Sequence, residues 1–452
     1  MAMFGINDRL KQLEAENTPI RVSLIGAGSM GTTLLEQIVM SPGMEIDVVA
    51  DLNIENAVHA LKMAGIEESR IAICSSVNDA EKALRDKKKV CTTNPELTWG
   101  VHSIQVFVEA TGHPSSLAYF ALSAIRNKKH VVTYNVEGDV CIGHILKMFA
   151  DNAGVVYTGI YGDEPGVVKA LYDEADALGF EIVAAGRHDM GGGKLEWNKE
   201  NIGKALEGSE QRTQYNPALF ASFCDGSKTN EECCMLANAT GLVPDIRGMH
   251  GPVVSYEEFI EKVPQQLDLK ENGGVLSRTG VVERIMPPEG PIIQPIWCFV
   301  VVRAKTDFQK AFMGRGRGKK RLSTSNRLFY TPYHYTSIQA PISIAYAFLY
   351  HQATICPKGE KRVADVIPIA KKDLIKGEII DEIGGLCAAG RVERASIVKE
   401  KNFIPFALVN GGRLKKDIEK GQPLSYEDVE LRDKEALIVQ FRRLQENLFG
   451  VV

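Results

Sequence analysis

A glycine-rich turn near the N-terminus constrains this chain more than any other feature. The stretch RVSLIGAGSMG, at positions 21–31, runs from an apolar segment into three glycines at G-x-G-x-x-G spacing. Gly26 suits a tight turn, Gly28 a close backbone approach, and Gly31 a helix packed against a strand. We expect this turn to hold the pyrophosphate of a dinucleotide at a helix N-terminus. Its predicted cofactor-binding residues are Gly26, Gly28, Ser29, Met30 and Gly31.

An acidic residue follows at the distance that such a turn requires. Asp51 lies 20 residues after Gly31, at the end of the apolar segment EIDVVADL, where a carboxylate can accept hydrogen bonds from the adenosine ribose. A carboxylate repels a 2′-phosphate, and neither Leu52 nor Asn53 offers a positive charge, so Asp51 favours NAD. In the alternative, Asp51 only caps the next helix and a basic residue from elsewhere completes an NADP site.

Strand and helix patterns alternate along the first third of the chain. Strands that alternate with helices imply a parallel, doubly wound sheet, so we predict an α/β fold of the Rossmann type. The predicted strands are 20–28, 45–52, 103–112 and 130–135, and the predicted helices are 8–17, 29–40, 117–128 and one that begins at residue 142.

Two strand ends resemble those of homoserine dehydrogenases. The segments VEATGHP and KHVVTYNVEGD contain a Thr-Gly and a VVT-x-N element, which line the nicotinamide pocket in that family. The resemblance implies that Thr111, Gly112, Thr133 and Asn135 contact the cofactor. Homoserine dehydrogenases usually carry a lysine after this asparagine, where the chain has Val136. The resemblance therefore indicates the family and not that particular activity.

The middle of the chain contains the candidates for chemistry. A strand pattern ends in the charged residues of GRHDMGGGK, and a helix begins within FCDGSKTNEECC. Such positions often carry active-site residues, although an ordinary helix start with favourable acidic residues explains the second segment equally well. The candidate catalytic residues are Lys194, Asp225, Lys228 and Glu231, and the candidate substrate-binding residues of this part are His188 and Asp189.

These segments, with PYHYTSIQAPISIAYA, resemble a wider set of homoserine dehydrogenase-like oxidoreductases that carry a C-terminal SAF domain. The set includes alternative 1-deoxy-D-xylulose 5-phosphate reductoisomerases, in which the substrate rearranges to a branched aldehyde that takes a hydride to give 2-C-methyl-D-erythritol 4-phosphate. This chemistry requires a divalent metal or a lysine beside the reacting oxygens, and an acid or base. Lys194 and Lys228 are the expected electrophile and proton relay. The expected bases or ligands of Mg²⁺ or Mn²⁺ are Asp189, Asp225 and Glu231.

The C-terminal part contains an internal repeat. KKDLIKGEIIDEIGG, which begins at Lys371, is echoed by KKDIEKGQPLSYEDV, which begins at Lys415. Two similar turn elements predict a small β-rich module, in agreement with the SAF resemblance, and we expect it to act as a structural cap or dimer contact. The predicted parts of the chain are an N-terminal helical arm (1–18), a Rossmann domain (19–156), an α+β substrate and dimerisation domain (157–355) and the β-rich SAF-like domain (356–452).

A basic stretch, FMGRGRGKKRLSTSN, separates two apolar strand patterns. Arginine side chains and glycine-rich backbone suit a phosphate, so Arg315, Arg317 and Lys319, with Arg321, are candidate substrate-binding residues. In the alternative, the stretch is a solvated hairpin tip.

The net charge and composition of the chain limit the kinds of partner that it can bind. The formal net charge of -4 at pH 7 gives no global attraction to nucleic acid, and no apolar run is long enough to span a bilayer. Nine cysteines without a C-x-x-C pair suit a reducing cytoplasm. We expect a cytoplasmic homo-oligomer that binds a small substrate.

Three functions agree with these observations. The first is a reductoisomerase that uses NADP or NAD. The second is a dehydrogenase or oxidoisomerase of a small polyhydroxy acid in sugar catabolism, and the third is a cofactor-binding scaffold without catalysis. The substrate is accordingly a polyol, a sugar acid or a sugar phosphate.

Overall fold

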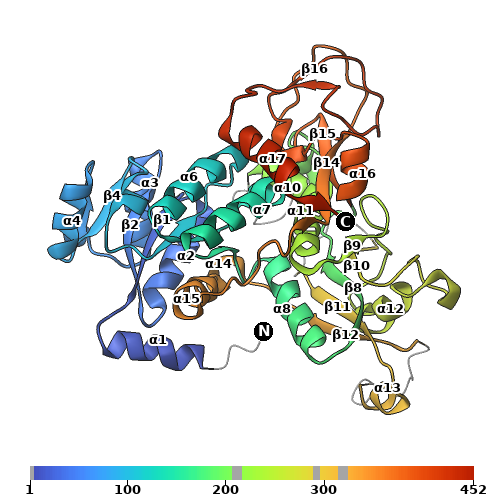
Figure 1. The fold of residues 1–452 in the computed structure, drawn as a ribbon, viewed down its shortest axis with the longest axis horizontal. Helices are drawn as coiled ribbons and strands as arrows, with labels where there is room; N and C mark the ends of the chain where they lie inside the picture. Colours follow the sequence, from blue (N-terminus) through green and yellow to red (C-terminus); the bar gives the residue numbers. More distant parts are fainter. Residues whose placement is uncertain (1–4, 206–215, 289–295, 314–323) are drawn as a thin grey trace.

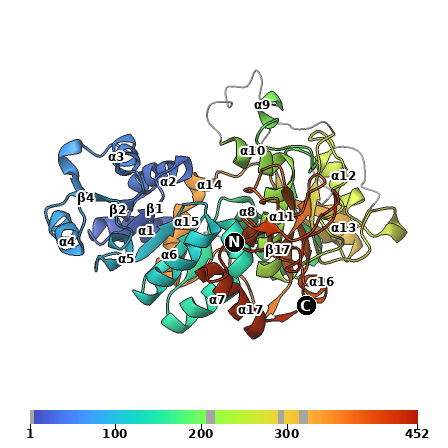
Figure 2. The same cartoon turned by 90° about the horizontal axis from the view of Figure 1, so that it is seen from above.

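The computed structural model describes residues 5–205, 216–288, 296–313 and 324–452. Two sheets of different topology occupy the two sides of the molecule, and a C-terminal β-rich module packs against helices of both parts (Figures 1 and 2). All nine cysteines lie in the described ranges, and none forms a disulfide. In the described part of the chain, no helix combines the length and apolar character needed to cross a membrane.

The first sheet has seven parallel strands in the order β3-β4-β2-β1-β5-β6-β7. This order, with helices on both faces, confirms the predicted doubly wound fold. The strands are β1 (Ile20–Ile25), β2 (Met44–Ala50), β3 (Ile71–Ile73), β4 (Lys89–Thr92), β5 (Val106–Glu109), β6 (His130–Thr133) and β7 (Tyr157–Gly159). The helices of this part are α1 (Ile6–Ala15), α2 (Ser29–Met40), α3 (Ile54–Met63), the 3₁₀ turn η1 (Glu68–Arg70), α4 (Val77–Arg85), α5 (Leu97–Gly100), α6 (Pro114–Arg126) and α7 (Val136–Ala153).

The structure corrects two predicted boundaries of this first part. Helix α7 begins at Val136 and not at Ile142, because the Asn135 side chain accepts a hydrogen bond from the Gly138 amide and so caps the helix. Strand β7 pairs with β6 and therefore extends the first sheet beyond residue 156.

Two helices from the predicted substrate domain return to the first sheet. These helices, α14 (Thr336–Gln339) and α15 (Pro341–Tyr350), lie beside α2 in Figure 1. Ile344 and Ala345 of α15 belong to the same buried cluster as Leu34 and Leu35 of α2. The segment 336–350 thus packs with the cofactor domain, although it follows the second sheet in the chain.

The second sheet is mixed, with the strand order β12-β11-β8-β10-β9. Strands β11 and β12 pair antiparallel, which confirms that the basic stretch connects two strands of a hairpin. The strands are β8 (Glu181–His188), β9 (Val243–Pro244), β10 (Val281–Ile285), β11 (Cys298–Arg303) and β12 (Asn326–Thr331). The helices of this part are α8 (Glu164–Ala177), α9 (Ile202–Ala205), α10 (Pro217–Cys224), α11 (Ser227–Thr240), α12 (Phe259–Gln266), the 3₁₀ turn η3 (Lys270–Asn272) and α13 (Asp307–Met313).

The C-terminal module is β-rich, as the repeat predicts. The two repeats face each other: the amides of Leu374 and Ile418 each donate to the carbonyl of the other, at 2.8 and 2.9 Å. Its elements are β13 (Lys361–Arg362), β14 (Ala364–Ala370), β15 (Ala388–Arg394), α16 (Ala395–Glu400), the 3₁₀ turn η4 (Phe406–Leu408), β16 (Arg413–Leu414), β17 (Val429–Glu430), α17 (Leu437–Leu448) and β18 (Gly450–Val451).

Candidate functional site

The glycine-rich turn has the geometry that a dinucleotide requires. Gly26 has a φ of 96°, and a Cβ there would lie 2.6 Å from the Ala110 carbonyl oxygen. A Cβ at Gly31 would overlap the carbonyl of Gly26, so α2 packs directly against the turn. At Gly28, in contrast, no protein atom lies within 4 Å of the position that a Cβ would take. Open space at this glycine fits a cofactor pyrophosphate. Ser29 and Met30 form the first turn of α2, as predicted.

Asp51 organises the loop after β2. Its carboxylate accepts hydrogen bonds from the amides of Ala27, at 2.8 Å, and Asn53, at 2.9 Å. The side chain that caps α3 is that of Asn53, which accepts from the Glu55 amide. Asp51 is therefore not the helix cap of the alternative interpretation, and its contact with a ribose remains a prediction.

The predicted nicotinamide-binding residues converge on a buried acid that the sequence did not single out. Glu109, at the end of β5, accepts hydrogen bonds from the Thr111 amide and hydroxyl and, at 3.0 Å, from the Thr133 hydroxyl. Burial raises the pKa of Glu109, although these donors oppose the shift. Thr133 in turn accepts from the Asn135 amide. The network holds the ends of β5 and β6 in one arrangement. The residue that could have predicted this network from the sequence is the glutamate of VEATG, which is Glu109.

A cavity of about 1030 Å³ opens between this cofactor region and the second sheet. Met30, Ala110, Gly112 and Tyr134 line it from the cofactor side. The opposite walls come from the start of α7, the turn between β7 and α8, α10, α11 and the segment before α14. The lining residues on those walls include Glu137, Asp163, Glu164, Met190, Phe220, Phe223, Lys228, Tyr333, His334 and Tyr335. Of the predicted catalytic residues, Lys228 reaches this cavity.

Lys228 forms a largely buried ion pair with Glu137. The two side chains come from α11 and from the first turn of α7, and Nζ lies 2.8 Å from Oε1. Burial alone would lower the pKa of Lys228, but the carboxylates of Glu137, Glu232 and Asp163 outweigh it and raise this pKa. Lys228 is thus a stable cation on the cavity wall.

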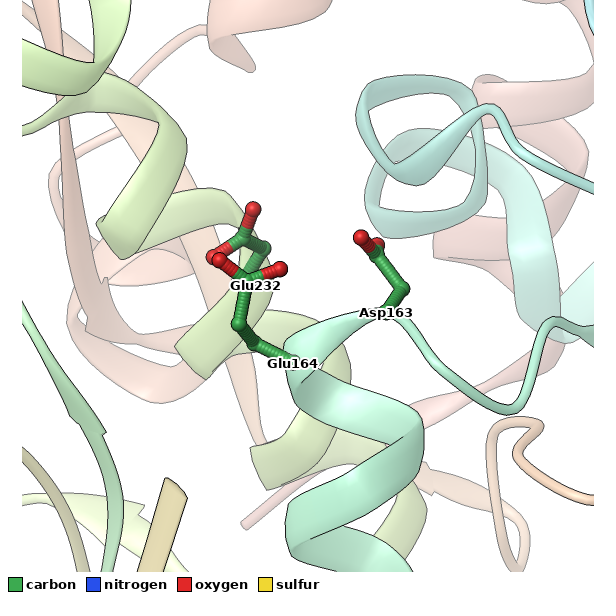
Figure 3. A group of neighbouring side chains, drawn as sticks. All are labelled: Asp163, Glu164 and Glu232. Atoms are coloured by element: carbon green, nitrogen blue, oxygen red, sulfur yellow. The ribbon is translucent and has the colours of Figure 1, made fainter. Parts of the chain in front are cut away.

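Three further acids lie in or directly behind the same wall, and sequence reasoning missed them. One oxygen from each of Asp163, Glu164 and Glu232 lies within 4.8 Å of the others, and Figure 3 shows the Glu164 and Glu232 carboxyl groups side by side near the start of α8. The adjacent acids of the GDEPG segment, Asp163 and Glu164, were a signal in the sequence. Glu232 comes close to them only because α11 packs on α8.

Arg187 contacts two of these acids and affects the pKa values of their carboxyl groups. It forms ion pairs with Glu164, at 2.8 Å, and with Glu232. Burial would raise the pKa of Glu164, but Arg187 and His334 lower it to about 2. Burial raises the pKa of Glu232 to about 8 and also raises that of Asp163. The cluster therefore combines carboxyl groups with lowered and raised pKa values, an arrangement suited to proton transfer or to a hard divalent ion.

The remaining predicted residues lie away from the cavity lining. Lys194 is exposed. His188 is buried, with Nδ1 3.1 Å from the Tyr256 hydroxyl, and burial lowers its pKa to about 4. Asp189 pairs with Arg284, and Glu231 is buried without a hydrogen-bond partner for either carboxyl oxygen.

The structure does not bring the predicted metal ligands Asp189, Asp225 and Glu231 within ligand spacing of one another. Asp225 is 2.7 Å from Lys371, Asp189 is held by Arg284, and within the described ranges only Asp163, Glu164 and Glu232 have the spacing of metal ligands. Arg315, Arg317, Lys319 and Arg321 lie outside the described residues.

Comparisons with known proteins identify both halves of this site. Residues 26–140 match the family model described as the NAD-binding domain of homoserine dehydrogenase. Residues 162–340 match the one described as the catalytic domain of oxidoreductase DRL. No curated protein matches the chain. Neither of the two family matches extends into the C-terminal module, so its SAF assignment remains a prediction.

Solved structures are similar only at a distance. A probable dehydrogenase from Thermotoga maritima is 12% identical, covering 62% of this chain and 72% of its own, with a TM-score of 0.34. Scyllo-inositol dehydrogenase from Lactobacillus casei, with NAD(H) and scyllo-inositol, is 10% identical, covering 63% and 73%, with a TM-score of 0.36. Biliverdin reductase from Synechocystis, with biliverdin and NADP+, is 15% identical, covering 42% and 54%, with a TM-score of 0.27. Similarity at this level carries no argument about the substrate.

Proposed function

Since this chain is an NAD(P)-dependent oxidoreductase that joins a homoserine dehydrogenase-type NAD-binding domain to a DRL catalytic domain, we propose that it transfers a hydride at a hydroxyl- or carbonyl-bearing carbon of a small polyhydroxylated substrate. The observation that carries this proposal is the Lys228–Glu137 ion pair on the wall of the cavity that also includes Met30 and Gly112. A cation there can stabilise the negative charge that develops on the substrate oxygen.

The first candidate reaction is the conversion of 1-deoxy-D-xylulose 5-phosphate to 2-C-methyl-D-erythritol 4-phosphate. The match to the DRL catalytic domain supports it, and so does the acid cluster. Asp163, Glu164 and Glu232 would hold Mg²⁺ or Mn²⁺ through hard oxygen ligands, and one buried Glu232 oxygen has no hydrogen-bond partner. A metal ion supplies a Lewis acid for the substrate's oxygens when it is bound. Lys228 orients the substrate from the neighbouring wall.

The second candidate is the dehydrogenation or oxidoisomerisation of a polyhydroxy acid. One observation favours it: both basic side chains that line the cavity in the described part of the chain lie close to carboxylates. Lys228 is paired with Glu137, and His334 lies 3.5 Å from Glu164. Carboxylates paired in this way can still accept hydrogen bonds from substrate hydroxyls, whereas a phosphate dianion needs donors that are not already committed. The matched catalytic domain argues against a scaffold without catalysis.

The test compares these substrates directly. Purified protein is mixed with NAD+ or NADP+ and each polyhydroxy acid, and with NADH or NADPH and 1-deoxy-D-xylulose 5-phosphate, with and without Mn²⁺, and nicotinamide absorbance is followed. Oxidation of NADPH by the sugar phosphate supports the first candidate, and reduction of NAD+ by an acid supports the second. The same assay answers whether the cofactor is NAD, as Asp51 favours, or NADP.

Lys228→Ala should lower kcat by about a hundredfold, the usual scale for one positioned electrostatic or acid–base group. Cofactor affinity, measured by nicotinamide fluorescence, should stay unchanged because Lys228 lies across the cavity from the glycine turn. The matched control is Lys169→Ala, which removes another lysine ion pair, with Asp173 at 2.6 Å on α8, outside the cavity lining. Equal activity of the two variants would contradict a role for Lys228 in the reaction.

A further inference from the structure

Two arginines from different parts of the chain meet behind the N-terminus of α11. Arg284 belongs to β10 of the second sheet, and Arg391 belongs to β15 of the C-terminal module. A Cβ placed on Gly226 would lie 2.9 Å from Nη1 of Arg284 and 3.8 Å from Nη1 of Arg391. Both guanidinium groups therefore approach one point at the seam between sheet and module.

Positive charge exceeds negative charge at this seam. Arg284 pairs with Asp189, at 2.9 Å, and Lys371 pairs with Asp225, at 2.7 Å. Arg391 donates only to carbonyl oxygens, those of Gly390 and Gly193, and has no carboxylate within ion-pair distance in the described part of the chain. Three cations thus share two carboxylates, and a partly buried charge without a counter-ion is costly.

The side chains at the seam retain capacity to bind. Nε of Arg284, on the side of the guanidinium that faces Gly251, is buried and has no hydrogen-bond partner, in a residue that is 7% exposed. Burial and the neighbouring Arg284 lower the pKa of Arg391 to about 10, so both arginines are protonated at neutral pH. Arg391 itself is partly exposed, which gives a ligand access from solvent.

The backbone at this point also favours an anion. Helix α11 starts at Ser227, after Gly226 in the left-handed conformation, and a helix N-terminus attracts negative charge. A Cβ on Gly193 would overlap the Arg284 guanidinium, so glycine at this position lets Arg284 lie against the backbone of the turn. The exposed Lys194 follows directly.

We propose that Arg284 and Arg391 form a binding site for a small oxyanion, a phosphate or carboxylate group. The site adjoins the reaction cavity, because Met190 lines the cavity and Gly191–Gly193 follows it, and because Lys228 is the second residue of α11. The oxyanion has two possible carriers: the acidic group of the substrate, in which case the inference rests on the proposed function, or a free anion that ties the module to the second sheet.

Inorganic phosphate and acetate are the probes, titrated by calorimetry into the full chain without substrate, at constant ionic strength in chloride. We expect saturable binding of at least one probe to the wild type, and binding weaker by about tenfold or more in Arg391→Gln, the scale for a hydrogen bond to a charged group. The control Arg413→Gln removes another module arginine that donates to a carbonyl, that of Gly377, and should bind as the wild type does. Wild-type protein that binds neither probe, or Arg391→Gln that binds both normally, would overturn the site.

Competition then identifies the carrier. If the substrate's own acidic group occupies the site, substrate displaces the probe and Arg391→Gln raises KM more than it lowers kcat. If a free anion occupies it, probe and substrate bind together. Because the titration requires no turnover, a protein inactive on every substrate tested would contradict the proposed function while leaving the oxyanion site intact. Arg391→Lys keeps the charge and should retain part of the binding, which separates loss of charge from misfolding.

Discussion

Gly28 and Gly31 belong to one turn, but glycine is needed at the two positions for different reasons. A side chain at Gly28 would extend into open space, whereas one at Gly31 would collide with the Gly26 carbonyl. Gly28→Val should therefore abolish NAD(P)H binding with little change in melting temperature. Gly31→Val should lower the free energy of unfolding by about 1 to 3 kcal/mol, the usual cost of overpacking. Nicotinamide fluorescence and thermal unfolding of both variants check this.

The opposite pattern would contradict the assignment of this turn. A folded Gly28→Val protein that binds the dinucleotide normally would mean that the space beside Gly28 is not where the pyrophosphate lies. Normal stability of Gly31→Val would mean that α2 can move away from β1, so that its close packing against the turn is not required for folding.

Helix α7 illustrates how one element serves both the site and the core. Its first turn presents Glu137 to the cavity, and Asp139 follows two residues later inside the protein, 2% exposed. One Asp139 oxygen accepts a hydrogen bond from the Tyr157 hydroxyl at 2.8 Å, and the other has no partner. Burial raises the pKa of Asp139 to about 7, against the opposing effect of Tyr157. The folded protein therefore favours the protonated carboxyl group.

This pKa predicts how Asp139→Asn depends on pH. A carboxyl group whose pKa is raised by folding stabilises the protein fully at low pH and loses that effect as the pH rises through the folded-state pKa. The amide group that replaces the carboxyl group in this variant is neutral throughout. The stability of the variant relative to the wild type should therefore increase from pH 5 to pH 7, by about 2 kcal/mol at about 1.4 kcal/mol per pH unit.

Urea unfolding at pH 5, 6 and 7 measures this difference. Using the difference between variant and wild type removes the effect of the buried His144 and His188, whose lowered pKa values change stability in the opposite direction. Asp8→Asn, on the exposed side of α1, is the control and should differ from the wild type equally at all three pH values. A pH-independent difference for Asp139→Asn would mean that Asp139 is ionised in the folded protein.

At the scale of the whole molecule, a buried ion pair joins the C-terminal module to the rest. Lys371, directly after β14, contacts Asp225 at 2.7 Å and the Gly385 carbonyl at 2.8 Å. Lys371→Met leaves the Asp225 carboxylate buried without its cation, so the free energy of unfolding should fall by about 3 to 5 kcal/mol. The double variant Lys371→Met/Asp225→Asn should recover part of this loss because the uncompensated charge is gone.

Denaturant unfolding of these variants provides the test, with Lys372→Met as the adjacent control. Lys372 is half exposed and pairs with Glu378, so its loss should cost no more than about 1 kcal/mol. If Lys371→Met is as stable as Lys372→Met, the pair does not hold the module in place. If the double variant is no better than Lys371→Met, the loss comes from packing and not from charge.

Local signals allowed much of the first domain to be predicted. The helix expected at 29–40 is observed as Ser29–Met40, because its start and its apolar periodicity are both encoded within a few residues. Strands β3 (Ile71–Ile73) and β4 (Lys89–Thr92) were missed. They are short, β3 is partly exposed and β4 begins with a lysine, so neither forms an apolar run. Pairing with neighbouring strands, and not their own pattern, makes them strands.

By itself, the sequence determined a dinucleotide-binding turn, a doubly wound sheet, a β-rich C-terminal repeat and Lys228 as a candidate for chemistry. These features depend on residues close together in the chain, where conformational preference and spacing act directly. Only the tertiary structure decided that Lys228 meets Glu137, that Glu232 joins Asp163 and Glu164, and that Asp225 is held by Lys371. Long-range packing determines which charged groups meet, and the low dielectric of the interior then strongly shifts their pKa values.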